Sequence, residues 1–312
     1  MNRSLIAPLA AILSLSSCST GSETDTAGRG GDAVTLQGKQ SSLSISITDA
    51  VIDSAQKVSV QFTSISIQPE DGEAIEHTFE SPQNIDLLSL QGTVFASLMS
   101  EQIIPAGKYE SIRLHVNASQ DGVNDSFIQL NDGSEHELYI PSGSQSGLKI
   151  NSGFELIESQ DLHLMIDFDL RKSVVLSNNE YKLRPTLRMV NMQDVEHISG
   201  SIDAALLTAG HCSDLNPETG NAVYLFEGHD IAADDIDNNN SGPVTSAAVN
   251  LNAENGLYEY TLAFMPPGEY TLAFTCQADD DNPEDNDTIV FSYSENITVE
   301  TAEDSPAINL MR

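Results

Sequence analysis

Apolar residues alternate with polar ones in many short stretches of the chain after residue 40, for example at 43–47, 58–62, 112–116 and 162–166. An alternation of period two puts one face of a strand on a core and the other in water, as in antiparallel sheet. Turn-forming Gly, Pro, Asn and Asp residues separate the stretches. Many short strands with regular turns predict an all-β chain built of sandwiches or barrels.

The 312 residues are enough for about two domains. We expect two β-sandwich domains in tandem, the first at 41–192 and the second at 197–312. One helical turn is expected within 86–98, where the leucines do not alternate. In the second domain, strands are predicted at 222–226, 247–251, 258–264, 270–276, 288–293 and 297–299.

A short motif occurs once in each predicted domain, as IPAGKY at 104–109 and MPPGEY at 265–270. Pro fixes φ and Gly permits positive φ, so the pair predicts a tight turn before a strand, with the Tyr covering the sandwich end. The motif resembles that of transthyretin-like and carboxypeptidase-regulatory-like sandwiches, which have a carbohydrate-binding-like fold. The alternative is a common turn used twice.

The N-terminus has the features of an export leader. A positively charged start ending at Arg3 precedes an apolar run at 5–15, which is too short to span a bilayer, and then Leu-Ser-Ser-Cys18. This resembles the lipobox of bacterial lipoproteins, which implies cleavage after residue 17 and fatty acids, such as palmitate, at Cys18. Residues 18–40 are rich in Ser, Thr, Gly and Asp and predict a flexible tether.

Lipidation implies a cell-envelope location, anchored to the membrane by lipid. In the lipoproteins that this motif resembles, an Asp directly after the lipidated cysteine favours the inner membrane. Ser19 stands at that position instead, so we expect the outer membrane, facing the periplasm or the surface. The two other cysteines, Cys212 and Cys276, would then lie in an oxidising compartment, where a disulfide is expected. Metal ligation by two cysteines is the weaker alternative.

The chain carries 13 basic and 47 acidic residues, a formal charge of -34. Because phosphate binding depends on Lys and Arg, nucleic acid is excluded as a partner. The surface is expected to be solvated and to attract cations.

Two runs concentrate the acidic residues, at 234–240 and 279–287. Calcium takes six to eight oxygen ligands, which short Asp/Asn loops supply, although neither run has the EF-hand spacing. Solvated acidic loops are the simpler interpretation, and a Ca²⁺ site that rigidifies them is the alternative. The candidate ligands are Asp234, Asp235, Asp237, Asp279, Asp280, Asp281, Asp285 and Asp287.

No set of catalytic residues is recognisable. TAGHC at 208–212 resembles the histidine motif of chymotrypsin-like proteases, but the Gly-Asp-Ser-Gly-Gly motif is absent and too little chain follows. The histidines show no zinc-binding spacing. Asp167 and Asp169 share a strand face and are expected to bond Arg171 or Arg184 rather than to act as an acid–base pair.

Six motifs in order across 41–192 resemble the bacterial lipoprotein family described as domain of unknown function 4382. They are LSISITDA (43–50), IDLLSLQG (85–92), IPAGKYESIRL (104–114), IPSG (140–143), IDFD (166–169) and YKLRP (181–185). The resemblance implies an exported β-sandwich and no assigned activity.

We therefore expect a non-catalytic cell-envelope lipoprotein that binds a protein or glycan partner through its loops, with no cofactor except Ca²⁺ in the alternative above. A carbohydrate- or calcium-binding accessory protein is the second hypothesis. The third is a hydrolase whose site is not recognisable in the sequence.

Overall fold

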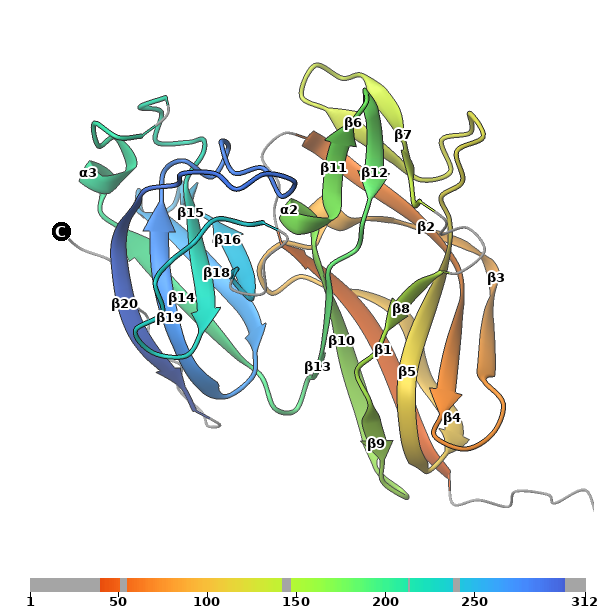
Figure 1. Ribbon diagram of the computed structural model, residues 1–312. Coiled ribbons are helices and arrows are strands. Elements are labelled where there is room, and N and C mark those ends of the chain that lie inside the picture. Colours follow the sequence, from red (N-terminus) through yellow and green to blue (C-terminus); the bar gives the residue numbers. More distant parts are fainter. Residues whose placement is uncertain (1–39, 51–54, 142–146, 213, 238–241, 301–312) are drawn as a thin grey trace, which may run out of the picture. The chain divides into compact units, whose positions relative to one another are not determined.

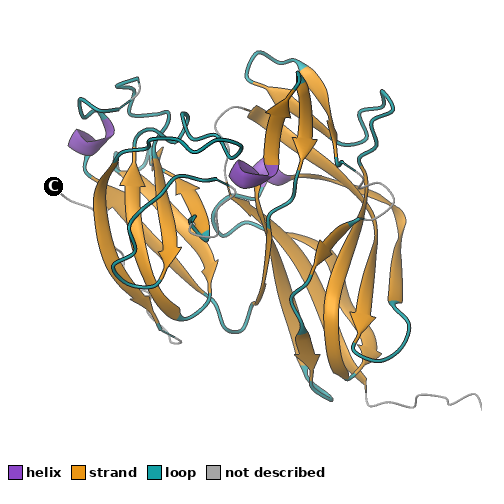
Figure 2. Ribbon diagram, in the orientation of Figure 1, coloured by secondary structure: helices purple, strands orange, loops and turns teal. Residues whose placement is uncertain are grey.

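The structure is a computed structural model that describes residues 40–50, 55–141, 147–212, 214–237 and 242–300. Cys18, the predicted leader and the predicted tether lie outside these residues, apart from residue 40. Strands dominate, and each helix is a single short turn (Figure 2). The all-β prediction is therefore confirmed. Among the described residues, no helix has the length and apolar character needed to cross a bilayer.

The first sandwich packs a four-stranded sheet against a nine-stranded one (Figure 1). The four-stranded sheet has the order β13-β10-β1-β4, with β1 (Gln40–Ala50), β4 (Ala96–Pro105), β10 (Asp161–Asp169) and β13 (Leu187–Asn191). The other has the order β11-β12-β7-β6-β2-β5-β8, with β3 beside β2 and β9 beside β5. Its strands are β2 (Ala55–Pro69), β3 (Ile75–Asp86), β5 (Gly107–Asn117), β6 (Phe127–Leu130), β7 (Glu135–Tyr139), β8 (Leu148–Ile150), β9 (Phe154–Leu156), β11 (Val174–Ser177) and β12 (Glu180–Leu183).

The alternating residues of these strands form one core. Leu43, Ile45 and Ile47 of β1 are fully buried against the corresponding residues of β2, β5 and β10. The predicted helical turn is the short 3₁₀ helix η1 (Leu87–Ser89), whose first two leucines point into this core. The alternation of apolar and polar residues thus predicted the buried face of these strands correctly.

The sheets are not antiparallel throughout, although the alternation is typical of antiparallel sheet. β1 and β10 pair in parallel, and so do β7 and β12. Alternation reports only which face of a strand is buried, and both pairing directions have the same period. Parallel partners need a long crossover between them, and more than 100 residues of chain separate β1 from β10.

The second sandwich consists of a three-stranded sheet, β14-β18-β17, and a four-stranded sheet, β16-β15-β19-β20. The strands are β14 (Glu196–Ile202), β17 (Asn250–Leu251), β18 (Tyr258–Met265), β15 (Ala222–Glu227), β16 (Thr245–Ala248), β19 (Gly268–Thr275) and β20 (Phe291–Val299). A helical turn, α3 (Ala204–Leu207), follows β14. The two strands predicted at 288–293 and 297–299 are the single strand β20.

Both faces of β15 are buried. Val223 and Leu225 point into the core between the two sheets. Tyr224 and Phe226 point to the other side, where Ile236 and Ala278 cover them. Ile236 is the one apolar residue among the aspartates of the first acidic run, and Ala278 precedes the second run. Both acidic loops are therefore anchored to the outer face of the same strand.

Candidate metal centre

Two aspartates of the second acidic run meet one aspartate of the first. Asp235, Asp281 and Asp287 each offer a carboxylate oxygen that lies within 4.8 Å of those of the other two. We call these three residues the carboxylate centre. Asp235 is 2% exposed and Asp281 is 8% exposed, whereas Asp287 is partly exposed. The anchoring of both loops on β15 brings together residues that are about 50 positions apart in sequence.

Asp281 ties the two loops to the core. Its carboxylate accepts a hydrogen bond of 2.6 Å from the buried phenol of Tyr224 on β15. It also accepts the backbone N–H of Ile236, at 3.0 and 3.1 Å from its two oxygens. Burial raises the pKa of Asp281 to about 6, although the hydrogen bonds from Tyr224 and Ile236 act in the opposite direction.

Asp235 is buried with one oxygen unmatched. Its Oδ2 accepts the backbone N–H of Asp287. Its Oδ1 is fully buried, and no described residue donates a hydrogen bond to it. Burial raises the pKa of this carboxyl, and the neighbouring Asp234 raises it further. Asp287 accepts the N–H of Asn282 at 2.7 Å, so its carboxylate is held within its own loop.

These oxygens are spaced as ligands of one ion. Ca²⁺ binds oxygens at about 2.3–2.6 Å, so two ligands on opposite sides of one ion lie at most about 5 Å apart. Three carboxylate oxygens within 4.8 Å of one another satisfy that limit. Ca²⁺ takes further oxygens from carbonyls, amides and water in flexible geometry, which suits a site on two loops. The residues present therefore fit a hard divalent cation.

The other five candidate ligands lie outside the centre. Asp234 Oδ1 accepts the N–H of Asp235, Asp237 accepts the amide of Asn286, and Asp285 accepts the amide of Asn282. Asp279 and Asp280 are exposed. Their carboxylates are not among the oxygens gathered at the centre. Asn238 to Asn240 of the first run lie outside the described residues.

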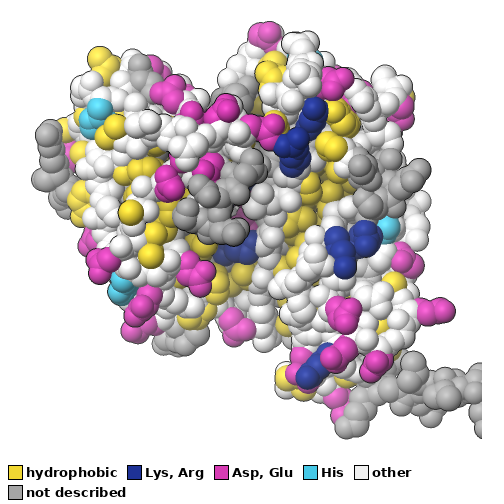
Figure 3. Space-filling model, in the orientation of Figure 1, with side chains coloured by type: hydrophobic (Ala, Val, Ile, Leu, Met, Phe, Trp, Pro, Cys, Tyr) yellow, Lys and Arg dark blue, Asp and Glu magenta, His cyan; other side chains and the backbone are white. Residues whose placement is uncertain are grey.

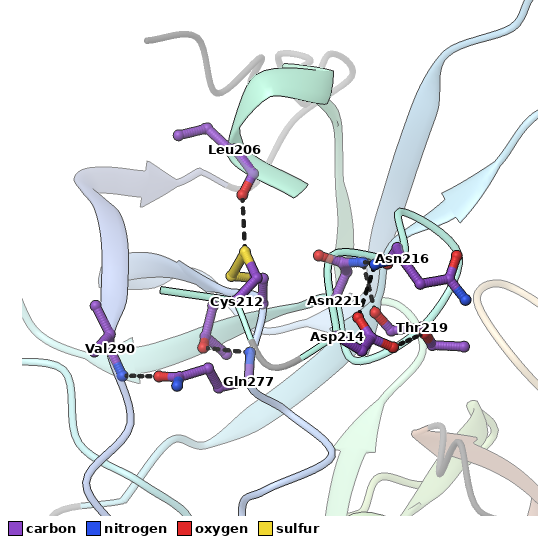
Figure 4. The surroundings of a disulfide bond; sticks show 10 residues. Leu206, Cys212, Asp214, Asn216, Thr219, Asn221, Gln277 and Val290 are labelled. Carbon is purple, nitrogen blue, oxygen red and sulfur yellow. Dashed lines mark hydrogen bonds between the residues drawn. A yellow bond between two sulfur atoms is a disulfide. The ribbon is translucent and has the colours of Figure 1, made fainter. Parts of the chain in front are cut away.

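The predicted disulfide between Cys212 and Cys276 is confirmed, with its Cα atoms 5.1 Å apart (Figure 4). It excludes the alternative in which these cysteines bind a metal, because both sulfurs are used in the bond. Cys276 lies just before the second acidic loop, and the next residue, Gln277, accepts the N–H of Val290 at 2.8 Å. The disulfide and this hydrogen bond fix the two ends of the loop that carries Asp281 and Asp287.

The paired aspartates of the first sandwich have structural partners, as expected, but not the predicted ones. Asp167 accepts Arg188 Nη2 at 2.7 Å. Asp169 caps the helical turn α2 (Leu170–Ser173) by accepting the N–H of Lys172, and its other oxygen lies 3.3 Å from Lys172 Nζ. The prediction of Arg171 or Arg184 is wrong, because Arg171 on α2 donates to the Ala278 carbonyl and Arg184 pairs with Glu284.

Ser66, His115 and Glu76 form a cluster on neighbouring strands that was not expected from the sequence. Ser66 Oγ lies 2.6 Å from His115 Nε2 and donates to Glu76 at 2.8 Å. A catalytic triad needs the histidine between the serine and the acid. Here the serine lies between the other two, so this cluster does not have the arrangement of a nucleophile, base and acid. No sequence motif marks it, because its members lie on three strands.

Comparison with known families gives one match, in the first sandwich. Residues 40–185 match the family model described as Domain of unknown function (DUF4382). The match agrees with the resemblance carried by the six motifs. The DUF4382 region runs from β1 to β12, so α2 and Arg171 lie within it. The carboxylate centre lies outside it.

No curated protein matches the chain. Among solved structures, one described as the Bacillus anthracis TIE protein is similar to 86% of this chain at 12% identity. The chain covers 33% of that protein, and the TM-score is 0.19, too low to carry an argument.

Proposed function

We propose that this chain is a non-catalytic binding module of the bacterial cell envelope whose second sandwich binds Ca²⁺ at the carboxylate centre. The observation that carries the proposal is the buried Asp235 oxygen for which no described residue is a donor. Buried charges are normally paired, because an uncompensated one costs several kcal/mol. The carboxylates of Asp281 and Asp287 lie beside it and repel its charge. A divalent cation bound among the three would attract all of them.

The chemistry of the site favours Ca²⁺ over other metals. The ligands are all oxygens, which suit hard cations such as Ca²⁺ and Mg²⁺ better than metals that prefer thiolate or imidazole ligands. Mg²⁺ demands nearly ideal octahedral geometry at shorter distances, whereas Ca²⁺ tolerates irregular sites. Acidic side chains are spread widely over the face shown in Figure 3, and the chain has 47 acidic against 13 basic residues, so the surrounding field attracts cations. Extracellular calcium modules bind at about 10⁻⁴–10⁻³ M, and we expect this range.

The envelope location is supported by the leader, by Cys18 with its lipobox-like context, and by the tether up to residue 40. The disulfide between Cys212 and Cys276 fits the same location, since disulfides persist in oxidising compartments. We propose an outer-membrane lipid anchor, with a protein or a glycan as the partner of the exposed loops.

Thermal denaturation of the purified chain tests the calcium site. A ligand at about ten times its Kd stabilises the folded state by roughly 1.4 kcal/mol. For a chain of this size that raises the Tm by about 3 °C. Calcium should therefore raise the Tm of the wild type but not that of Asp235→Asn.

The matched control is Asp285→Asn, which removes the same charge from the second acidic loop, outside the centre. It should keep the calcium response. A wild-type Tm that does not change with millimolar Ca²⁺, together with no heat of binding in calorimetry, would reject the proposed calcium function.

A further inference from the structure

Arg171 of the first sandwich reaches the second acidic loop. It lies on α2, whose position is fixed by the Asp169 cap, and it is only 7% exposed. Its Nη1 donates a hydrogen bond of 2.8 Å to the backbone carbonyl of Ala278. Figure 1 shows α2 beside the loop that follows β19. A side chain from the DUF4382 region therefore holds the start of the loop that carries Asp281 and Asp287.

The same guanidinium acts on the centre itself. Burial raises the pKa of Asp281 and that of Tyr224, which donates to Asp281, and the positive charge of Arg171 opposes both rises. Ala278 is buried against Tyr224 on the outer face of β15, three residues before Asp281. A displacement of Ala278 would thus be transmitted directly to Asp281.

A second contact holds the same loop farther along. Arg184, also in the DUF4382 region, forms an ion pair with Glu284. Asp281 lies between Ala278 and Glu284 in the sequence, so the first sandwich contacts the loop on both sides of this residue. The Arg184 pair is partly exposed, and exposed pairs contribute little. The buried Arg171 contact is the one expected to determine the loop's position.

We propose that Arg171 is a positioning residue for the calcium site, so that calcium binding in the second sandwich and docking onto the first are coupled. The inference rests on the proposed function, since it concerns the same carboxylate centre. Coupling is reciprocal. The first sandwich holds the loop in its binding conformation, and calcium in turn stabilises the contact with α2.

The charge and the position of Arg171 have opposite effects on calcium affinity. As a nearby positive charge, the guanidinium repels a cation, so its removal alone would strengthen binding. As the partner of Ala278, it orders the loop, so its removal would weaken binding. The sign of the change on substitution therefore separates positioning from simple electrostatics.

Isothermal titration of Ca²⁺ into the wild type, Arg171→Met and Arg171→Lys provides the test. Both substitutions should weaken calcium binding roughly tenfold, within the usual range of coupling between sites. Arg171→Lys keeps the charge but not the planar donor group, so its loss of affinity would be due to position.

Arg188→Met is the matched control. Arg188 also joins the two sandwiches, by donating to the Phe264 carbonyl at 2.9 Å, but it lies away from the carboxylate centre. This variant should lower the metal-free Tm as Arg171→Met does and leave the calcium affinity unchanged. If Arg171 served only to stabilise the protein, Arg171→Met and Arg188→Met would have the same effect on calcium affinity.

Hydrogen exchange of the α2 amides supplies a second readout in the wild type. Protection should increase when Ca²⁺ is added. Unchanged or tighter calcium binding in Arg171→Met would overturn the inference while leaving the proposed function intact. No calcium binding by the wild type would reject both.

Discussion

Asp235 has a carboxylate that is buried while one of its oxygens has no donor among the described residues. A buried polar atom without a partner calls for an explanation, and functional sites commonly trade stability for activity in this way. The neighbouring Asp281 shows the contrast, since its two oxygens accept three hydrogen-bond contacts from Tyr224 and Ile236. The centre thus combines the carboxylate of Asp281, whose two oxygens both accept hydrogen bonds, with that of Asp235, which has one oxygen available to bind a cation.

This contrast predicts that Asp235→Asn stabilises the metal-free protein. The neutral amide removes a buried negative charge, and its N–H₂ group can donate to the neighbouring carboxylates. We expect a gain of about 1 kcal/mol in the free energy of unfolding, measured by urea denaturation in a chelator. The same variant should gain nothing from calcium. A loss of stability in the chelator would contradict the assignment of Asp235 as an uncompensated charge.

The two tyrosines of the repeated motif illustrate what the sequence could predict for single residues. Tyr109 donates to the carbonyl of Pro105 at 2.5 Å, and Tyr270 donates to that of Pro266 at 2.9 Å, four residues back in each case. The tight turn before the strand was thus predictable from the motif in both sandwiches. The glycines differ, since Gly107 has a φ of 152° whereas Gly268 does not have positive φ. Only the first position therefore needs glycine for its backbone conformation.

Which three of the eight aspartates meet was not predictable. Composition marks both runs as acidic, but it does not say how they face each other. That depends on Ile236 and Ala278, two apolar residues that fix the loops on β15. A buried apolar residue within an acidic run was the available signal, and its importance is clear only once β15 is known to be covered on both faces.

At the scale of elements, the disulfide connects the segment before β15 to the end of β19 across 64 residues. Its loss in a Cys212→Ser, Cys276→Ser double variant should cost at most about 4 kcal/mol in the chain-entropy model. It should also weaken calcium binding, because Cys276 lies just before the second acidic loop and holds its start. Chemical denaturation and calcium titration of the double variant check both effects. Unchanged stability would show that the disulfide adds nothing to the fold.

A β-bulge in β14 contains the other ionisable group of interest. The register of β14 and β18 shifts between Glu196 and Ile198, and His197 Nδ1 accepts the N–H of Phe264 at 3.1 Å. Phe264 has a φ of 53°, a conformation that is unfavourable for a bulky residue. The bulge thus places the strained Phe264 next to His197, whose Nδ1 must remain unprotonated to accept this hydrogen bond.

Burial lowers the pKa of His197 below its usual 6.5. The unfolded chain therefore binds the proton more readily than the folded one, and the stabilising contribution is present above about pH 6.5 and is lost as the pH falls below it. His197→Asn keeps an acceptor that cannot be protonated, so its stability should fall less between about pH 7.5 and 5.5. Urea denaturation across this range tests it. Identical pH dependence of the two proteins would contradict a neutral, half-buried His197.

At the scale of the whole molecule, the two sandwiches share a buried contact in addition to the arginine bonds. Met165 and Val190 of the first sandwich pack against Phe264 of the second. The alternation predicted both sandwiches and the six motifs predicted the DUF4382 match. The contact between them was not predictable, because period two assigns residues to the core of one sandwich and cannot identify those that join two.

The proposed envelope location makes its own prediction at this scale. Cys18 should carry fatty acids, and the leader before it should be absent from the mature protein. Mass spectrometry of the chain purified from bacterial membranes should find the modified cysteine as the first residue, and Cys18→Ser should appear outside the membrane fraction. An unmodified Cys18 with the leader still attached would remove the anchor from this account.

The central claim is that one cation binds beside Asp235, Asp281 and Asp287. Tb³⁺, which shares the oxygen preference of Ca²⁺, emits light when a nearby excited tyrosine transfers energy to it. The chain has no Trp, and Tyr224 is hydrogen-bonded to Asp281. Excitation of tyrosine should therefore produce Tb³⁺ emission that Ca²⁺ displaces and that is lost in Asp235→Asn. Emission that persists in Asp235→Asn, or no sensitised emission in the wild type, would contradict the claim.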